Sequence, residues 1–123
     1  MNKIVKGLMI AGTLGASLMA FTRTADAKDK DGNIVIVIDP GHGGEDPGSL
    51  ATTGATESKC NYAIAEVMKK ELSKYDGVKV YLTREEDTWM TNMGRAMIAA
   101  DLNADFLISI HNNSTSDESI SAN

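Results

Sequence analysis

The chain contains two histidines, and each follows a segment with the pattern of a β-strand. His42 lies in Asp-Pro-Gly-His-Gly-Gly, just after the β-branched run 34–38, and His111 directly follows the apolar segment 106–110. A neutral imidazole is the commonest protein metal ligand. Two imidazoles and one carboxylate, with a position left for water, form a familiar catalytic zinc arrangement. Both histidines are therefore candidate metal ligands.

The third ligand would be a carboxylate, for which Glu57 is the first candidate. Glu57 begins a predicted helix at the far end of a glycine-rich loop, so it would face back toward the histidines. Glu45, Asp46 and Asp39 are alternatives in the same loop. A purely structural interpretation also stays open, because a histidine beside a glycine-rich turn can serve the loop, and an acidic residue at a helix start favours the helix dipole.

The elements that must position these residues alternate along the chain. Segment 34–38 is β-branched and apolar throughout, which is typical of a strand covered on both faces. The order strand, helix, strand, helix, strand predicts an α/β fold, a parallel β-sheet with helices on its faces. The expected elements are a strand at 34–38, a long loop at 39–56, a helix at 57–75, a strand at 78–82, a helix at about 90–103 and a strand at 106–110.

Apolar residues at helical spacing indicate which helix faces should pack on the sheet. In the first helix these are Tyr62, Ala65, Val67, Met68 and Leu72, and in the second they are Met93, Ala96, Met97 and Ala100. In open parallel sheets, sites form at the carboxyl ends of the strands. We therefore expect both histidines at the same edge of the sheet.

The N-terminal residues have the pattern of a secretory signal peptide. A start containing Lys3 and Lys6 precedes the uncharged, mostly apolar run 7–21, and Ala25-Asp26-Ala27 matches a signal peptidase site. The apolar run is shorter than the roughly 20 residues that span a bilayer. The sequence thus predicts a signal peptide at 1–27, a secreted mature chain that begins at Lys28, and no stable membrane anchor.

The charge of the chain argues against a nucleic acid partner. The full chain carries a net charge of −5. Loss of Lys3, Lys6, Arg23 and Asp26 with the signal would leave nine basic and sixteen acidic residues, a net charge of −7. Such an acidic chain lacks the basic surface that nucleic acid binding requires. Cys60 is the only cysteine, so it cannot form an intramolecular disulfide, and we expect a small buried residue.

Several separated motifs resemble one enzyme family. They are Ile38-Asp-Pro-Gly-His-Gly-Gly-Glu-Asp-Pro-Gly, Glu57, Leu82-Thr-Arg-Glu-Glu-Asp, Arg95, and Ala104-Asp-Phe-Leu-Ile-Ser-Ile-His-Asn-Asn. In this order they resemble the zinc-dependent, AmiC-like N-acetylmuramoyl-L-alanine amidases, over about residues 34–113. The resemblance implies that residues 28–123 are the N-terminal part of an amidase catalytic domain, a βαβαβ portion of a larger domain.

The resemblance also implies a chemistry and a substrate. His42, Glu57 and His111 would bind one zinc ion, with water in the remaining position. The reaction would be hydrolysis of the amide bond between N-acetylmuramic acid and L-alanine in peptidoglycan. Asn112 and Asn113 are candidate substrate-binding residues, with ordinary turn residues after a strand as the alternative.

Other motif residues are expected to be structural, and one catalytic group is expected to be missing. We interpret Arg84, Asp87 and Arg95 as structural, with Asp87 near the start of the second helix and the two arginines tying loops together through paired charges. The resemblance implies a general-base glutamate beyond the second histidine, and we expect it to lie past the chain end. Loss of a general base typically lowers a rate by roughly 10²- to 10⁴-fold. A truncated, non-catalytic zinc-binding or wall-binding fragment is therefore the alternative to an active amidase.

Overall fold

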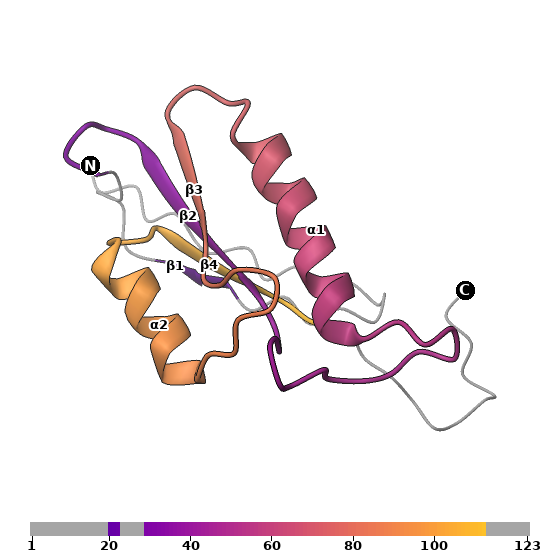
Figure 1. Ribbon diagram of the computed structural model, residues 1–123. Coiled ribbons are helices and arrows are strands. Elements are labelled where there is room, and N and C mark those ends of the chain that lie inside the picture. The colour runs from indigo at the N-terminus through magenta and orange to yellow at the C-terminus, as the bar shows by residue number, and fades with distance from the viewer. Residues whose placement is uncertain (1–19, 23–28, 113–123) are drawn as a thin grey trace.

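The computed structural model of this chain describes residues 20–22 and 29–112 (Figure 1). Asn113 and most of the predicted signal peptide lie outside the described residues. The described elements are β1 (Ala20–Thr22), β2 (Ile34–Pro40), α1 (Glu57–Leu72), β3 (Val78–Leu82), α2 (Asn92–Asp101) and β4 (Phe106–Ile110). Within the described part, no helix is both long enough and apolar enough to cross a membrane.

The strands form one sheet in the order β1-β4-β2-β3. Strands β3 and β4 each pair in parallel with the central strand β2, which confirms the predicted α/β fold with a parallel sheet. One strand was not predicted: β1 pairs antiparallel with β4, so the complete sheet is mixed. Its three residues lie within the predicted signal peptide, 1–27, at the end of an apolar run where no strand pattern stands out.

Helix α1 packs on one face of the sheet and forms the main core with it. The pairing Ile36–Val80 and Ile38–Leu82 aligns apolar residues of neighbouring strands on that face. Fully buried Ile38 and Ala65 lie at the centre of this core. Val67, which was predicted to face the core, is 61% exposed, because the buried stripe of α1 is narrower than the sequence pattern indicated.

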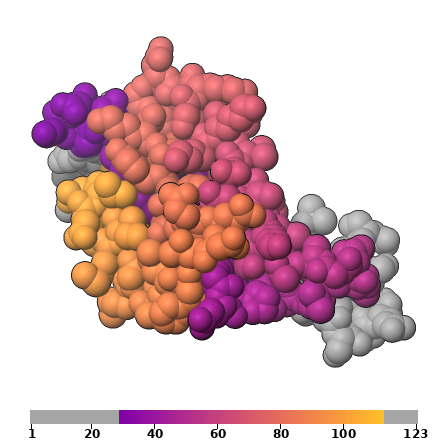
Figure 2. Space-filling model, viewed as in Figure 1, coloured from indigo at the N-terminus to yellow at the C-terminus, as the bar shows by residue number. Residues whose placement is uncertain are grey.

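Helix α2 lies on the opposite face, and its predicted apolar face was wrong. Strand residues alternate between faces, so Asp39 points away from α1, and Arg95 of α2 contacts it. Met93 and Met97 are 70% and 55% exposed, whereas Arg95 is buried. The surface of α2, orange in Figure 2, is not covered by another described segment. The helix is therefore fixed by a buried arginine rather than by its methionines.

The parallel strands deliver the two histidines to one edge, as predicted. Strand β2 ends at Pro40 and β4 ends at Ile110, and these two residues are partners in the register. His111 follows β4 directly, and His42 follows β2 after Gly41. The loop from 41 to 56 has no helix, contains only two isolated bridges, and leads into α1 at Glu57. The loop 41–56 and the start of α1 therefore lie at the same edge of the sheet as the two histidines.

Candidate metal centre

His42 lies just past β2 in an uncommon backbone conformation. Its φ angle is +63°, in the left-handed region that residues with a side chain rarely adopt. The ring Nδ1 lies 2.8 Å from Asp46 Oδ2. A carboxylate only accepts, so Nδ1 donates this hydrogen bond and the other ring nitrogen, Nε2, faces the site. The hydrogen bond with His42 is the main cause that lowers the pKa of Asp46.

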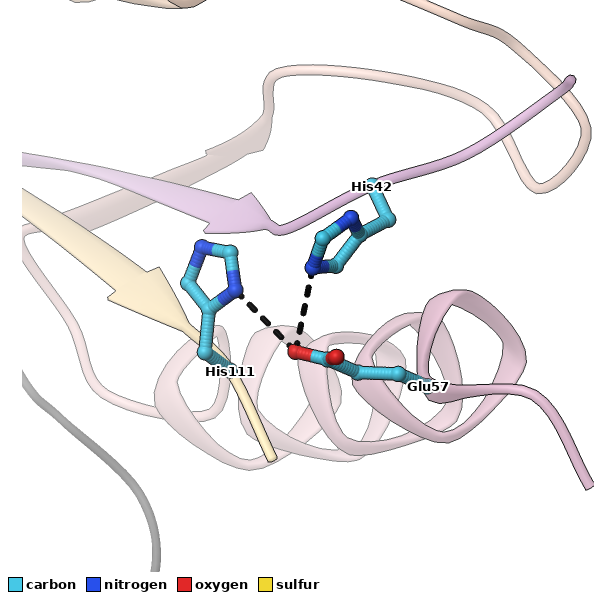
Figure 3. Close-up of side chains that lie close together, drawn as sticks. All are labelled: His42, Glu57 and His111. Atoms are coloured by element: carbon cyan, nitrogen blue, oxygen red, sulfur yellow. Dashed lines mark hydrogen bonds and ion pairs between the residues drawn. The ribbon is translucent and has the colours of Figure 1, made fainter. Parts of the chain in front are cut away.

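Glu57 is the first residue of α1 and stands between the two histidines (Figure 3). Its Oε1 lies 3.2 Å from His42 Nε2 and 3.1 Å from His111 Nδ1. One ligand atom from each of the three residues lies within 4.8 Å of the others. The predicted convergence of His42, Glu57 and His111 is therefore present in the structure.

The Glu57 carboxylate is buried yet ionised. Burial raises the pKa of Glu57, but hydrogen bonds from Ser49, from the Asn112 backbone N–H and from His111 outweigh it, and the pKa is lowered to about 2. The Ser49 N–H donates to Oε2 at 3.0 Å and the Asn112 N–H to Oε1 at 3.1 Å. A charged carboxylate is thus held in place at neutral pH, which suits a metal ligand.

Two glycines make room for the converging side chains. A Cβ on Gly41 would overlap the ring of His111, and a Cβ on Gly48 would stand 2.6 Å from His42 Cδ2 and 2.8 Å from Glu57 Oε2. The rings of His42 and His111 meet edge to face, with centroids 5.1 Å apart. The glycine-rich loop is therefore needed for close packing at the site.

The donor set and its spacing suit a tetrahedral metal ion. Zinc bonds to nitrogen and oxygen of roughly 2.0–2.2 Å separate tetrahedral ligand atoms by about 3.3–3.5 Å. The two nitrogen–oxygen separations at Glu57 Oε1, 3.2 Å and 3.1 Å, are slightly shorter, and all three ligand atoms lie within 4.8 Å of one another. Three protein ligands would leave the fourth position of a tetrahedral ion for water, which is the arrangement of catalytic rather than structural zinc sites.

The alternative carboxylates have other positions. Asp46 contacts His42 from the outer side of the ring, and Gly48 N–H donates to its second oxygen at 3.0 Å. Asp39 accepts from Thr83 and Arg95 beneath the site. Glu45 is exposed and does not belong to the cluster.

Arg84 and Arg95 are both buried and tie loops together. Arg95 does so through an ion pair with Asp39, as predicted, but Arg84 does so through backbone carbonyl oxygens rather than through a paired charge. Arg84 donates to the carbonyl oxygens of Pro40, Gly41 and Ser58, so it joins the end of β2 to the start of α1. It also lies over the ring of Tyr62, 5.5 Å from the centroid. Helix α2 begins at Asn92, capped by the side chain of Thr91, so Asp87 lies in the preceding loop rather than at the helix start.

Asn61 is a site residue that the sequence reasoning missed. It is fully buried, and its amide donates to Gly41 O at 3.2 Å and accepts from Asn112 Nδ2 at 2.6 Å. Its position four residues after Glu57, hence on the same face of α1, could have indicated it. The proposed substrate role of Asn112 stays a prediction. Cys60 is half-buried rather than buried.

The fold and the site together define an α/β protein with a candidate mononuclear metal centre at the carboxyl edge of a parallel sheet. Comparison with known proteins gives the family. The sequence profile of the N-acetylmuramoyl-L-alanine amidase family Amidase_3 matches residues 36–122. The chain belongs to this family, as its motifs predicted.

Curated relatives are similar over the same part of the chain. The N-acetylmuramoyl-L-alanine amidase AmiC of Escherichia coli O6:H1 is 38% identical over 67% of this chain and 20% of its own length. AmiA of Escherichia coli K12 is 39% identical over 69% of this chain and 29% of its own length. The sporulation-specific amidase of Bacillus subtilis is 39% identical over 66% and 32%. The chain thus spans less than a third of these relatives.

Solved amidase structures share the fold. The catalytic domain of CwlV from Bacillus (Paenibacillus) polymyxa var. colistinus superposes with a TM-score of 0.66 and 34% identity, over 68% of this chain and 48% of that domain. An N-acetylmuramoyl-L-alanine amidase from Clostridium difficile 630 superposes with a TM-score of 0.67 and 36% identity, over 70% and 47%. The chain therefore corresponds to about half of each solved structure.

Proposed function

We propose that this chain binds one zinc ion through His42, Glu57 and His111 and serves hydrolysis of the amide bond between N-acetylmuramic acid and L-alanine in peptidoglycan. The observation that carries the proposal is the convergence of two imidazoles and an ionised carboxylate from three separate elements. Family membership supports the choice of substrate.

The chemistry divides between the ion and the residues of the chain. A zinc ion bound at such a site polarises the substrate carbonyl and lowers the pKa of the attacking water. Glu57 and the histidines hold the ion, while Asp46 orients the His42 ring. Asn112 and Asn113 are the proposed substrate-binding residues. No described residue is assigned as general base, because Asp46 and Asp39 are both engaged in other contacts.

A non-catalytic zinc-binding or wall-binding fragment is the second candidate. One observation favours it: Asp46 and Asp39, the described aspartates beside the three ligands, are both engaged in other contacts, so neither is assigned as a general base. The same three ligands would hold the ion, but peptidoglycan would be bound without hydrolysis. Both candidates require zinc, so zinc binding alone does not distinguish them.

The proposed site of action is outside the cytoplasm. Residues 1–27 would act as a cleaved signal peptide, without a stable membrane anchor, and peptidoglycan lies on the far side of the cytoplasmic membrane. The acidic mature chain would have no nucleic acid partner. The protein would therefore be secreted, to the cell wall, the periplasm or the exterior.

The first experiment measures zinc in the purified chain by elemental analysis and then the release of soluble peptide from peptidoglycan sacculi. One zinc per chain with peptide release, both absent in Glu57→Ala, would establish an amidase. One zinc per chain without release would establish the non-catalytic candidate. A folded chain that binds no zinc would refute both.

A further inference from the structure

A buried ion pair lies directly beneath the metal centre. Arg95 Nη1 lies 2.8 Å from Asp39 Oδ1, and the two side chains are 8% and 9% exposed. Asp39 also accepts hydrogen bonds from Thr83 Oγ1 at 2.6 Å and from Ser109 Oγ at 2.9 Å. Ser109 stands two residues before His111 on β4. The pair therefore connects α2 to the ends of all three parallel strands.

The same guanidinium also holds the backbone on both sides of Gly41. Arg95 Nη1 donates to Pro40 O at 2.8 Å, and Nη2 donates to His42 O at 2.7 Å. Its Nε donates to Met90 O at 3.2 Å, which ties the guanidinium to the loop just before α2. One side chain thus fixes the peptide group before Gly41 and the peptide group after His42.

His42 needs such an external hold, because its φ of +63° is unfavourable for a residue with a side chain. Its neighbours Gly41 and Gly43 are glycines, the residue type with the widest range of backbone conformations, so they do not impose a conformation on His42. Without a fixed carbonyl, the backbone at His42 would relax toward negative φ. The direction of the Cα–Cβ bond would change with it, and the ring would turn away from Glu57.

We propose that Arg95 is a positioning residue of the metal centre, which holds His42 in its left-handed conformation and so aims the His42 ring at Glu57. The inference deepens the proposed zinc site and rests on it for its functional meaning. The hydrogen bonds of the Arg95 guanidinium go to Asp39, Pro40 O, His42 O and Met90 O, and none goes to the side chain of His42, Glu57 or His111. It acts through the carbonyl oxygen of His42.

The geometry also explains why the residue is an arginine. The guanidinium makes four contacts, to Asp39, Pro40, His42 and Met90, in a planar fork. A lysine carries its charge on a single nitrogen at the end of a flexible chain. It can keep the ion pair with Asp39, but it cannot reach both backbone carbonyls in the same geometry. The substitution Arg95→Lys therefore keeps the positive charge beside Asp39 but removes the hydrogen bonds that hold the backbone at His42.

The test uses the full chain with Arg95→Lys and Arg95→Met, and Lys79→Met as the matched control. Lys79 also forms an ion pair with an aspartate near β2, at 2.8 Å from Asp29, but at the other end of the strand. Folding is followed by circular dichroism. Zinc affinity is measured with Zn²⁺ alone, in competition with a chromophoric chelator.

A second measurement follows the histidine rings in the metal-free protein. The chain has only two histidines, so histidine-selective isotope labelling gives two sets of ring signals, which His111→Ala assigns. This measurement does not depend on zinc. It therefore tests the role of Arg95 even if the proposed zinc site fails, and a wild-type chain without zinc affinity would refute the zinc site alone.

We expect folded Arg95→Lys to bind zinc about 10- to 100-fold more weakly, the usual effect of losing a group that orients a metal ligand. The ring signals of His42 should shift and those of His111 should stay, while Lys79→Met leaves both unchanged. Unchanged His42 signals in folded Arg95→Lys would overturn the proposal. An unfolded Arg95→Lys would overturn it too, because Arg95 would then be required for the fold itself.

Discussion

His42 is held between two carboxylates, with Asp46 on one side of its ring and Glu57 on the other. Nδ1 lies 2.8 Å from Asp46 Oδ2, and Nε2 lies 3.2 Å from Glu57 Oε1. The hydrogen bond to Asp46 fixes the ring orientation and the tautomer of His42. Asp46, which the sequence offered as an alternative ligand, instead contacts the His42 ring and orients it.

The first prediction concerns Asp46. Asp46→Ala should weaken zinc binding by about 10- to 100-fold without abolishing it, because the ring loses its orienting acceptor but keeps its metal-facing nitrogen. Isothermal titration calorimetry with Zn²⁺ measures the change. Glu45→Ala is the control, since Glu45 is the neighbour of Asp46, is exposed and does not belong to the cluster of His42, Glu57 and His111. A complete loss of zinc in Asp46→Ala would instead indicate a direct ligand.

The second prediction concerns the three ligands. His42→Ala, Glu57→Ala and His111→Ala should each reduce bound zinc from one per chain to nearly none, because each removes one of three protein donors. Elemental analysis of the dialysed variants gives the content. If His42→Ala kept stoichiometric zinc, the ligand assignment would be wrong.

The third prediction concerns space at the site. Gly41→Ala should destabilise the fold by about 1–3 kcal/mol and displace the His111 ring, since the added Cβ overlaps that ring. Gly94→Ala on α2 is the matched control, because its Cβ would meet only side-chain atoms of Met90 and Thr91, the nearest at 3.1 Å. Urea denaturation compares the two. If Gly41→Ala and Gly94→Ala were equally stable, the loop at Gly41 would accommodate the added Cβ without loss of stability.

The fourth prediction concerns pH. The ion pair with Lys79, with hydrogen bonds from Asn33 and Asp31, holds the pKa of Asp29 well below its ordinary value. A lowered folded-state pKa stabilises the protein above the unfolded-state pKa of about 3.9, and this stabilisation is lost as the pH falls through the folded-state value. The melting temperature of wild type should therefore exceed that of Asp29→Asn by a constant margin between pH 5 and 7. This margin should shrink below about pH 4.

The margin is measured by thermal denaturation across this pH range. Asp31→Asn is the comparison, because Asp31 is exposed and lies farther from Lys79, at 3.4 Å. Its melting temperature should differ less from wild type. A margin for Asp29→Asn that grew on acidification would contradict the sign of the pKa shift.

The fifth prediction concerns the N-terminus. If residues 1–27 are a cleaved signal, N-terminal sequencing of the exported protein should begin at Lys28. Ala27→Pro, which disrupts the cleavage pattern, should leave the precursor uncut. An exported chain that retains Met1 would refute the assignment. Cleavage would also remove β1, so the outer edge of β4 would differ between precursor and mature protein.

Much of the fold could be predicted, because its elements have strong local patterns. The β-branched run at 34–38 and the apolar segments 78–82 and 106–110 correspond to β2, β3 and β4. Helix α2 shows the limit of such patterns. Its methionines at helical spacing predicted a buried stripe, but the buried residue is Arg95, whose ion partner Asp39 is 56 positions away. No local pattern contains that pairing.

The convergence of the three candidate ligands could be predicted, but not the contacts that support them. Two histidines after strand ends, and a glutamate at a helix start, are sequence features with a geometric meaning. The choice among Asp39, Asp46 and Glu57 required the direction of each side chain. The alternation of side chains along β2 could have predicted that Asp39 points to the other face of the sheet. The contact of Asp46 with His42 could not be predicted, because it depends on the path of an irregular loop.

The left-handed backbone at His42 sets metal binding against stability at one position. Holding a residue with a side chain there costs about 1–2 kcal/mol relative to glycine. A glycine at position 42 would thus give a more stable metal-free chain with no complete site. Selection for stability alone would remove the histidine. The proposed ion would compensate for this cost, because it would bind the folded chain and not the unfolded one and so add its binding energy to the stability of the fold.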